Sequence, residues 1–164
     1  MSTGTKTAIS KAVDAKVMAR IVEEGYGPGA WHGADLQAAL ADVSAELAFW
    51  RPARERHNIA EIALHHAYHA NAVGAKLAGK KPEEFVLKGE DWFELNEQGK
   101  LSWTKIQSVV AEAQKRLGKA AAENGTKESA ALSGAERFEL VLGITCHAIY
   151  HAGQIQLIKR LRAG

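Results

Sequence analysis

The stretch that decides the fold is SGAERFELVLGITCHAIYHAGQIQLIKRLR, residues 133–162 of a chain of 164 residues. It opens with Ser133-Gly134-Ala135-Glu136, a capping box whose side chains satisfy the free N–H groups at the start of a helix. The apolar residues after it recur at helical spacing and form one stripe: Leu140, Ile144, Ile158 and Leu161. We therefore predict one long amphipathic helix over residues 134–162.

The rest of the chain is also predicted to be helical, because Pro and Gly residues divide it into segments with helical periodicity. Long helices are expected over about residues 7–24, 58–78 and 102–123, with Asn58 and Glu61 capping the second. A short extra helix, about residues 34–43, lies between the first two. The prediction is a single all-α domain, residues 1–164, folded as a four-helix bundle.

The loop over residues 79–101 is long for a compact domain and carries Phe85, Trp92 and Phe93. A loop with this many aromatic residues is more typical of a packed flap than of a disordered linker. Trp92 and Phe93 are therefore candidates either to fill an end of the bundle or to cover a substrate.

Composition argues against several classes of protein. The 21 Lys and Arg residues nearly balance the 19 Asp and Glu residues, which is not typical of a nucleic-acid-binding protein. The apolar runs are all shorter than the ~18 residues of a membrane-spanning helix. The single cysteine, Cys146, has no partner for an internal disulfide, and the first residues lack an apolar signal core. We expect a cytoplasmic protein that binds neither nucleic acid nor membranes.

The sequence contains seven histidines and one cysteine, and five of the histidines form two groups along the chain. In the later group, His147 and His151 are four residues apart, so they point the same way from the apolar stripe of their helix. Gln154 shares that stripe. Burying an imidazole without a partner costs ~1–3 kcal/mol, and a divalent metal would satisfy both rings. The alternative is a pair of core histidines bonded to the backbone or to neighbouring helices.

The earlier group is His65, His66 and His69, midway along the helix predicted over residues 58–78. His66 lies near the centre of the apolar stripe, and His69 and His65 lie progressively toward one edge. Periodicity offers three candidate ligands and does not choose among them. One of them with His147 and His151 would give three neutral imidazoles and an open coordination position, which is typical of a catalytic metal.

Other metal and nucleotide chemistries are excluded by their missing motifs. Ala148 follows His147, so the His-Glu-x-x-His pattern of metalloproteases is not present. The sequence has no Glu-x-x-His step of the kind that di-iron bundles use, and one cysteine is too few for an iron–sulfur or zinc-finger site. Neither of the common glycine-rich phosphate-binding motifs occurs.

Three segments resemble the DinB/YfiT-like metalloenzymes: His147 to Ile155, Asn58 to His65, and Trp31-His32-Gly33. The similarity extends over about residues 31–161. It implies an up-down-down-up four-helix bundle, a divalent metal that is often nickel or zinc, and a homodimer, with no DNA binding.

The resemblance also implies a ligand set. The family's ligand on the second long helix lies six residues after the apolar position that Ile59 matches, which is His65. His147 and His151 match the other two ligands. His66 departs from the family, which usually has an aliphatic residue there.

Relatives with known activity are thiol-dependent: transferases that use bacillithiol, mycothiol or glutathione, and a maleylpyruvate isomerase. The function that the resemblance implies is therefore a small-thiol S-transferase acting on a small-molecule substrate. A metal-dependent hydrolase on the same site is one alternative, because a metal also activates water. A non-catalytic stress or interaction protein with a structural metal is the alternative from another class.

Several further residues carry simpler expectations. Cys146 is interpreted as a small packed side chain rather than a nucleophile. His32 is expected either to cap the short helix or to reach the mouth of the site as an acid–base group. Core packing is expected for Tyr150, a structural role is expected for His57, and the part played by His69 stays open.

Three glycines, Gly74, Gly143 and Gly153, fall inside predicted helices, where each costs ~1 kcal/mol relative to alanine. We expect a close approach between helices near the site to explain them.

Overall fold

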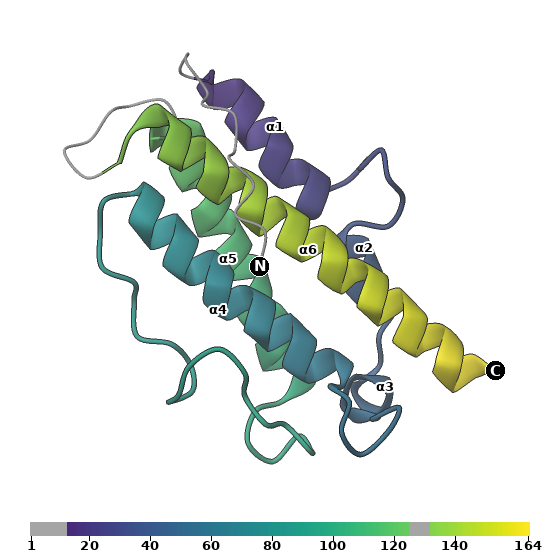
Figure 1. Ribbon diagram of the computed structural model, residues 1–164. Helices are drawn as coiled ribbons and strands as arrows, with labels where there is room; N and C mark the ends of the chain where they lie inside the picture. Colours follow the sequence, from purple (N-terminus) through teal and green to yellow (C-terminus); the bar gives the residue numbers. More distant parts are fainter. Residues whose placement is uncertain (1–12, 125–131) are drawn as a thin grey trace, which may run out of the picture.

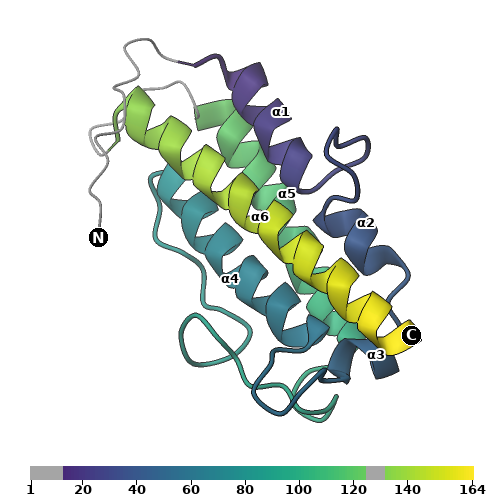
Figure 2. The ribbon, with the colours of Figure 1, turned by 45° about the vertical axis from the view of Figure 1, so that its right-hand side comes forward.

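The computed structural model describes residues 13–124 and 132–164, and every regular element in these ranges is an α-helix. The four long helices are α1 (Ala15–Gly25), α4 (Ile59–Leu77), α5 (Trp103–Asn124) and α6 (Gly134–Ala163). Figures 1 and 2 show that α1 and α6 run in one direction and α4 and α5 in the other. The predicted all-α fold is confirmed. Within the described ranges, no helix combines the length and hydropathy that a membrane span requires.

The packing of the four long helices places the two histidine groups next to each other. Helix α4 packs against both α5 and α6, and α1 also packs against both, so α1 and α4 lie diagonally across the bundle. Because α4 and α5 are parallel, the chain must return along the bundle between them, and residues 78–102 make this return (Figure 1). The seam between α4 and α6 is where the histidines of both helices face each other.

Both predicted capping boxes are present in the structure. At the start of α4, the Glu61 backbone N–H donates to the Asn58 side chain at 2.9 Å, and the Glu61 carboxylate accepts from the Asn58 backbone N–H. At the start of α6, the Glu136 N–H donates to Ser133 Oγ at 3.3 Å, and the Ser133 N–H donates back to Glu136 Oε2 at 2.7 Å. These caps fix where the two histidine-bearing helices begin.

The first long helix begins later than predicted. Asp14 has an extended backbone, with φ −60° and ψ 143°, and its side chain accepts the Lys16 N–H at 2.8 Å. This N-cap starts α1 at Ala15 instead of about Thr7. Residues 7–12 of the predicted helix lie outside the described residues. The end of α1 at Gly25 is within one residue of the prediction.

Two short helices take the place of the single one expected over residues 34–43. They are α2 (Leu36–Ala41) and α3 (Ala45–Phe49). The Asp35 side chain accepts the Ala38 N–H at 3.1 Å and begins α2. Ser44 is extended and accepts the Leu47 N–H at 3.2 Å, so it begins a second helix that the sequence analysis missed.

The segment between α4 and α5 packs on the bundle, as expected. Phe93 and Leu95 are buried, and the Phe93 ring stacks on Phe85 with their centroids 5.2 Å apart. The Tyr68 ring of α4 meets both aromatic rings edge-on. The Asn58 side chain donates to the Leu95 carbonyl at 2.6 Å. These contacts hold the segment over the middle of α4.

The glycines inside the helices have different explanations. A Cβ on Gly74 would lie 3.3 Å from the Leu117 Cα, so α4 and α5 approach closely there, as expected. A Cβ on Gly143 or Gly153 would meet no atom within 4 Å, so the expectation of a close approach is wrong for these two.

Replacing Gly74 with leucine should destabilise the protein by about 1–3 kcal/mol, because the new side chain would press on the α5 backbone. Gly143→Leu is the matched control: its site is open, and the better helix propensity of leucine should leave stability unchanged or raise it by up to ~1 kcal/mol. Chemical denaturation monitored by circular dichroism measures both. Equal effects of the two substitutions would contradict a tight α4–α5 contact at Gly74.

Candidate metal centre

Four histidine rings from α4 and α6 converge in the seam between these helices. The Nε2 atom of His147 lies 3.1 Å from Nε2 of His65 and 3.1 Å from Nε2 of His151. One nitrogen each from His65, His69 and His147 also lie within 4.8 Å of one another. The geometry therefore brings together the three expected ligands and adds His69 beside them.

The nitrogen spacing fits a shared divalent cation. Two nitrogens bound to one ion at about 2.0–2.1 Å are roughly 2.9 Å apart at a right angle and roughly 3.4 Å apart at the tetrahedral angle. The two separations of 3.1 Å lie between these values. The residues present thus have the donor chemistry that a metal ion requires, and both separations from His147 Nε2 are compatible with a shared ion.

The second ring nitrogen of two of these histidines is held by a hydrogen-bond acceptor. His65 Nδ1 donates to the Asp91 backbone carbonyl at 3.0 Å, and His151 Nδ1 donates to Gln154 Oε1 at 2.6 Å. A proton on Nδ1 leaves the lone pair on Nε2, which is the arrangement of a metal-binding histidine. The Gln154 amide N–H in turn donates to the Tyr150 hydroxyl at 3.1 Å.

Asp91 also anchors His69. The Asp91 Oδ1 atom lies 2.7 Å from His69 Nε2 and 3.0 Å from His65 Nδ1. The hydrogen bond from His69 lowers the pKa of the Asp91 carboxyl. Asp91 has φ 65°, in the left-handed region that few residues other than glycine adopt. The sequence analysis missed this residue, because it lies in an irregular segment where periodicity gives no signal.

Burial keeps the clustered histidines neutral. His65 and His151 are only 6% and 3% exposed, and His147 is half-buried. Burial, reinforced by the neighbouring imidazoles, lowers the pKa of His147 to about 3. Burial likewise lowers the pKa of His151 to about 4 and that of His65, against the opposing effects of Gln154 and Asp91. Neutral imidazole is the form that binds a metal.

Trp92 covers one side of the centre. Its indole stacks on the His65 ring with centroids 3.8 Å apart and on the His57 ring with centroids 3.7 Å apart, both nearly parallel. Two rings this close cannot share one face of the indole without overlapping, so Trp92 is sandwiched between them. Phe93 instead points into the core and is 5% exposed.

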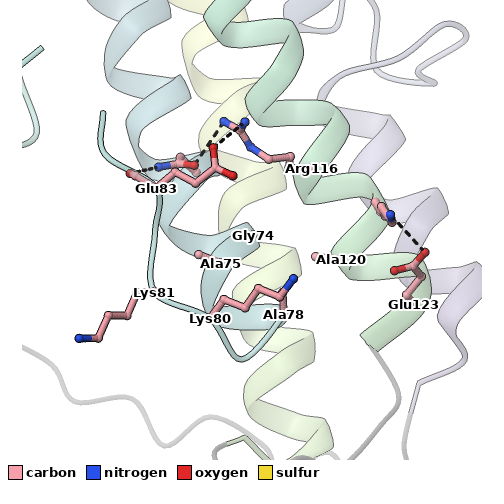
Figure 3. Close-up of a pocket in the computed structure, with 11 residues that line it drawn as sticks. Gly74, Ala75, Ala78, Lys80, Lys81, Glu83, Arg116, Ala120 and Glu123 are labelled. Atoms are coloured by element: carbon pink, nitrogen blue, oxygen red, sulfur yellow. Dashed lines mark hydrogen bonds and ion pairs between the residues drawn. The ribbon is translucent and has the colours of Figure 1, made fainter. Parts of the chain in front are cut away.

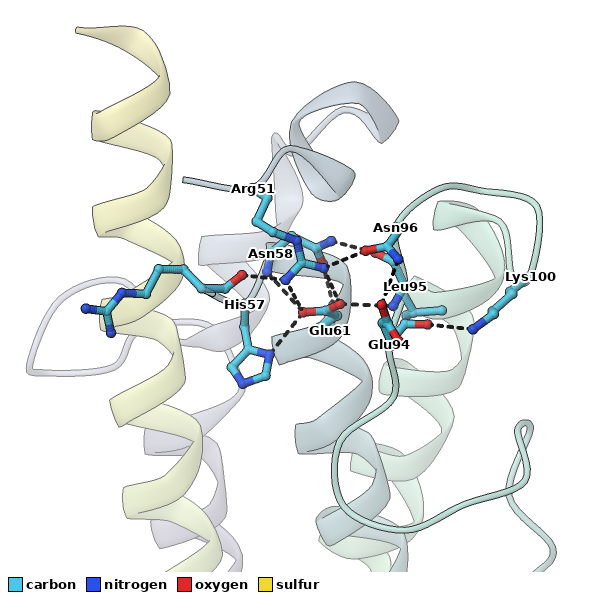
Figure 4. Close-up of polar contacts among 9 residues, drawn as sticks. Arg51, His57, Asn58, Glu61, Glu94, Leu95, Asn96 and Lys100 are labelled. Atoms are coloured by element: carbon cyan, nitrogen blue, oxygen red, sulfur yellow. Dashed lines mark hydrogen bonds and ion pairs between the residues drawn. The ribbon is translucent and has the colours of Figure 1, made fainter. Parts of the chain in front are cut away.

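A polar network around Glu61 holds the start of α4 and the His57 side chain in place (Figure 4). The Glu61 carboxylate accepts hydrogen bonds from Arg51 at 2.5 and 3.0 Å, from the Leu95 N–H at 3.0 Å, and pairs with His57 Nδ1 at 3.0 Å. Burial raises the pKa of Glu61, but the hydrogen bonds from Arg51, Leu95 and His57 outweigh it and hold the pKa below its ordinary value. The network orients the stack of His57, Trp92 and His65, which agrees with the structural role expected for His57.

His66 lies on the far side of His147 from the converging nitrogens. It is fully buried, and its Nδ1 atom lies 3.1 Å from His147 Nδ1. Its Nε2 atom lies 2.6 Å from Nε2 of Gln114, a buried residue of α5. Gln114 was missed in the sequence analysis, although a polar residue within the apolar stripe of α5 was a usable signal.

Three single-residue expectations are decided by the structure. His32 is exposed and its Nε2 contacts the Glu24 carbonyl at 2.7 Å, so it caps the end of α1 and not the short helix α2. Tyr150 is 64% exposed, and Cys146 is also exposed, so core packing is wrong for both. Both lie on the side of α6 that faces away from its neighbours.

Two surface cavities differ in their relation to the histidines. The pocket in Figure 3, about 480 Å³, lies between α4 and α5, and its Arg116 pairs with Glu83 at 3.1 Å. Its lining residues include none of the histidines. A second cavity, about 550 Å³, is lined by Arg54, His57 and Trp92 among others. It therefore adjoins the indole that covers the metal centre.

A helical bundle whose facing helices direct several histidines into one seam has the architecture of a metal-binding bundle protein. A family model described as the DinB superfamily matches residues 30–155, and the chain belongs to this superfamily. The resemblance to DinB-like proteins is thereby confirmed. Searches among curated proteins and among solved structures found no match.

Glu61→Gln should lower the free energy of unfolding by about 3 kcal/mol near neutral pH, because it removes the buried charge that Arg51 faces. Since the pKa of Glu61 is lowered on folding, its stabilising effect is present above pH ~4.5, the unfolded value, and is lost as the pH falls through the lower folded value. The difference in the free energy of unfolding between wild type and Glu61→Gln should therefore become smaller below pH ~4.5. Urea denaturation at several pH values measures it.

Glu97→Gln, at an exposed position, is the matched control and should have almost no effect. If the free energies of unfolding of wild type and Glu61→Gln differ by the same amount down to pH ~3, the proposed role of the Glu61 charge is wrong.

Proposed function

We propose that the chain is a divalent-metal-dependent enzyme that uses a small thiol as co-substrate, with His65, His147 and His151 as the metal ligands. The observation that carries the proposal is that His65 Nε2 and His151 Nε2 each lie 3.1 Å from His147 Nε2. Membership of the DinB superfamily supports it.

The donor set supports nickel or zinc. Imidazole nitrogens suit the later first-row divalent ions, whereas magnesium and calcium prefer oxygen ligands. The nearby carboxylate, Asp91, is bonded to His69 and His65 and so acts on the ligands instead of competing with them. Three protein ligands also leave a coordination position open for a substrate.

The chain's own residues prepare the site for this chemistry. When bound, a divalent ion would lower the pKa of a thiol or a water molecule and so make it a nucleophile. The Asp91 carbonyl and the Gln154 side chain fix the ring orientations of His65 and His151. Trp92 shields one face of His65 from water, and the cavity beside it offers room for a small-molecule substrate.

Substitution of each proposed ligand tests the metal site. His65→Ala, His147→Ala and His151→Ala should each weaken zinc or nickel binding by at least ~100-fold, because each removes one of three nitrogen donors. Isothermal titration and elemental analysis of the purified variants measure this. His32→Ala is the control, since that exposed side chain contacts the end of α1.

His69→Ala separates the two possible triplets. If His65, His147 and His151 are the ligands, His69→Ala should retain the metal with a modest loss of affinity. Loss of metal in His69→Ala but not in His151→Ala would instead assign His65, His69 and His147. Undiminished metal content in both His147→Ala and His151→Ala would overturn the proposed site.

Titration of the cobalt-loaded protein with small thiols tests the co-substrate. Direct binding of a thiolate should produce a sulfur-to-cobalt charge-transfer band that His147→Ala abolishes. If thiols cause no change but ester or amide substrates are cleaved, the site is hydrolytic. If neither occurs, the protein is a non-catalytic metal binder.

We also propose that two copies of the chain associate through the outer face of α6. Four large apolar side chains on this helix are 43–64% exposed: Leu142, Tyr150, Leu157 and Leu161. Their spacings of eight, seven and four residues keep them on one side of the helix. An apolar stripe of this length on a helix is typical of an interface between subunits.

Leu157→Glu should shift the protein toward monomer in sedimentation velocity, because an unpaired charge would be buried within the interface. Lys105→Glu, an exposed position on α5, is the control and should leave the oligomeric state unchanged. A monomeric wild type would contradict the proposed dimer.

A further inference from the structure

A buried polar pair lies behind the candidate metal centre and belongs to none of the proposed ligands. His66 of α4 is fully buried, with His147 Nδ1 on one side at 3.1 Å and the Gln114 amide on the other at 2.6 Å. Gln114 is itself 5% exposed, and its Oε1 atom is buried with no hydrogen-bond partner. Burying these polar groups is costly, which indicates that they have a role at this position.

The protons on this chain of contacts can be assigned, because a neutral imidazole has one N–H and one lone pair. In the structure, the Gln114 amide nitrogen faces His66 Nε2, so that ring nitrogen accepts. The proton of His66 is then on Nδ1 and is donated to His147 Nδ1. His147 must therefore carry its own proton on Nε2.

That assignment gives a consistent network without metal. The His147 Nε2–H points between the lone pairs of His65 Nε2 and His151 Nε2, each 3.1 Å away. Both lone pairs are available because Nδ1 carries the proton in both rings. In this arrangement, however, His147 Nε2 is a donor and has no lone pair for a cation.

Metal binding requires the opposite arrangement. His147 Nε2 must lose its proton, and the neutral ring must then be protonated on Nδ1, where it donates to His66 Nδ1. His66 must in turn carry its proton on Nε2 and needs an acceptor there. Gln114 supplies one when its amide turns over by half a rotation, which brings Oε1 to the position of the amide nitrogen.

We propose that His66 and Gln114 are positioning residues that set the tautomer of His147, and that the Gln114 amide faces His66 with its nitrogen when the site is empty and with its oxygen when a cation is bound. The proposal rests on the ligand role of His147 given above.

The number of protons on the two rings is the same before and after this change. One proton leaves His147 Nε2 for solvent water, one crosses from His66 Nδ1 to His147 Nδ1, and one is taken up from solvent water at His66 Nε2. Each ring carries one proton before and after, so no net charge is buried.

The amide is suited to this role because it carries a donor and an acceptor on one rotatable group. A residue with only one of these functions could satisfy one arrangement and not the other. Substitution of residues that orient a metal ligand typically changes metal affinity by 10–100-fold. An effect of that size is therefore expected at Gln114, which touches no proposed ligand in the described contacts.

The test combines nitrogen-15 histidine NMR, which reads the protonated nitrogen of each ring, with zinc affinity measured by chelator competition. In the zinc-free protein we expect protons on His147 Nε2 and His66 Nδ1, and in the zinc-loaded protein on His147 Nδ1 and His66 Nε2. Gln114→Met should weaken zinc binding about 10–100-fold, because it removes the acceptor for His66 Nε2–H. Gln114→Glu should restore most of the affinity, because a carboxylate oxygen can accept that proton.

Gln107→Met, at a partly exposed position on the same helix, is the matched control and should bind zinc as wild type does. Thermal unfolding of the zinc-free variants checks that Gln114→Met is folded; if it is not, the ring tautomers of the wild-type protein decide the matter alone. The proposal is overturned if the His66 and His147 tautomers are the same with and without zinc, or if folded Gln114→Met binds zinc as tightly as wild type. Retention of zinc by His147→Ala would instead overturn the ligand assignment, so the two failures are distinguishable.

Discussion

The constraint on which the structure depends is the crowding of three imidazole nitrogens in the seam between α4 and α6. His65 and His151 both present lone pairs toward His147, because their protons are committed to the Asp91 carbonyl and to Gln154. At most one proton, that of His147, lies between the three nitrogens. Without a cation, the single N–H of His147 has to serve both lone pairs, whereas a cation could take a lone pair from each nitrogen that binds it. Contacts around the seam therefore have to hold the three rings in place.

The directions of the helices determine which segment of the chain lies against the histidines. Parallel α4 and α5 require a long return, and residues 78–102 run along α4 to make it. The return places Asp91 and Trp92 directly against His65. Glu61 helps to attach this segment to α4, because its carboxylate accepts the Leu95 N–H and also caps the helix. One carboxylate thus fixes both the helix start and the segment that covers the site.

The sequence was most informative where structure is local. The spacing of His147 and His151, the capping boxes at Asn58 and Ser133, and the ends of α4, α5 and α6 depend on neighbours within about four residues, and these predictions agree with the structure. Asp91 could not be predicted in the same way, because its position depends on how an irregular segment packs across α4. The exposure of Tyr150 was mispredicted because α6 carries apolar residues on more than one face, and periodicity does not show which face a neighbouring helix covers.

The buried hydrogen bonds also show why α5 matters to a site built from α4 and α6. Gly74 allows α4 and α5 to approach closely, because a Cβ at this position would lie only 3.3 Å from the Leu117 Cα. Close packing of these two helices brings the Gln114 side chain within reach of His66. A polar path therefore runs from α5 through α4 to His147 on α6. Because each ring on this path carries one proton, a change of the group that Gln114 presents at the α5 end favours a different proton position at the α6 end.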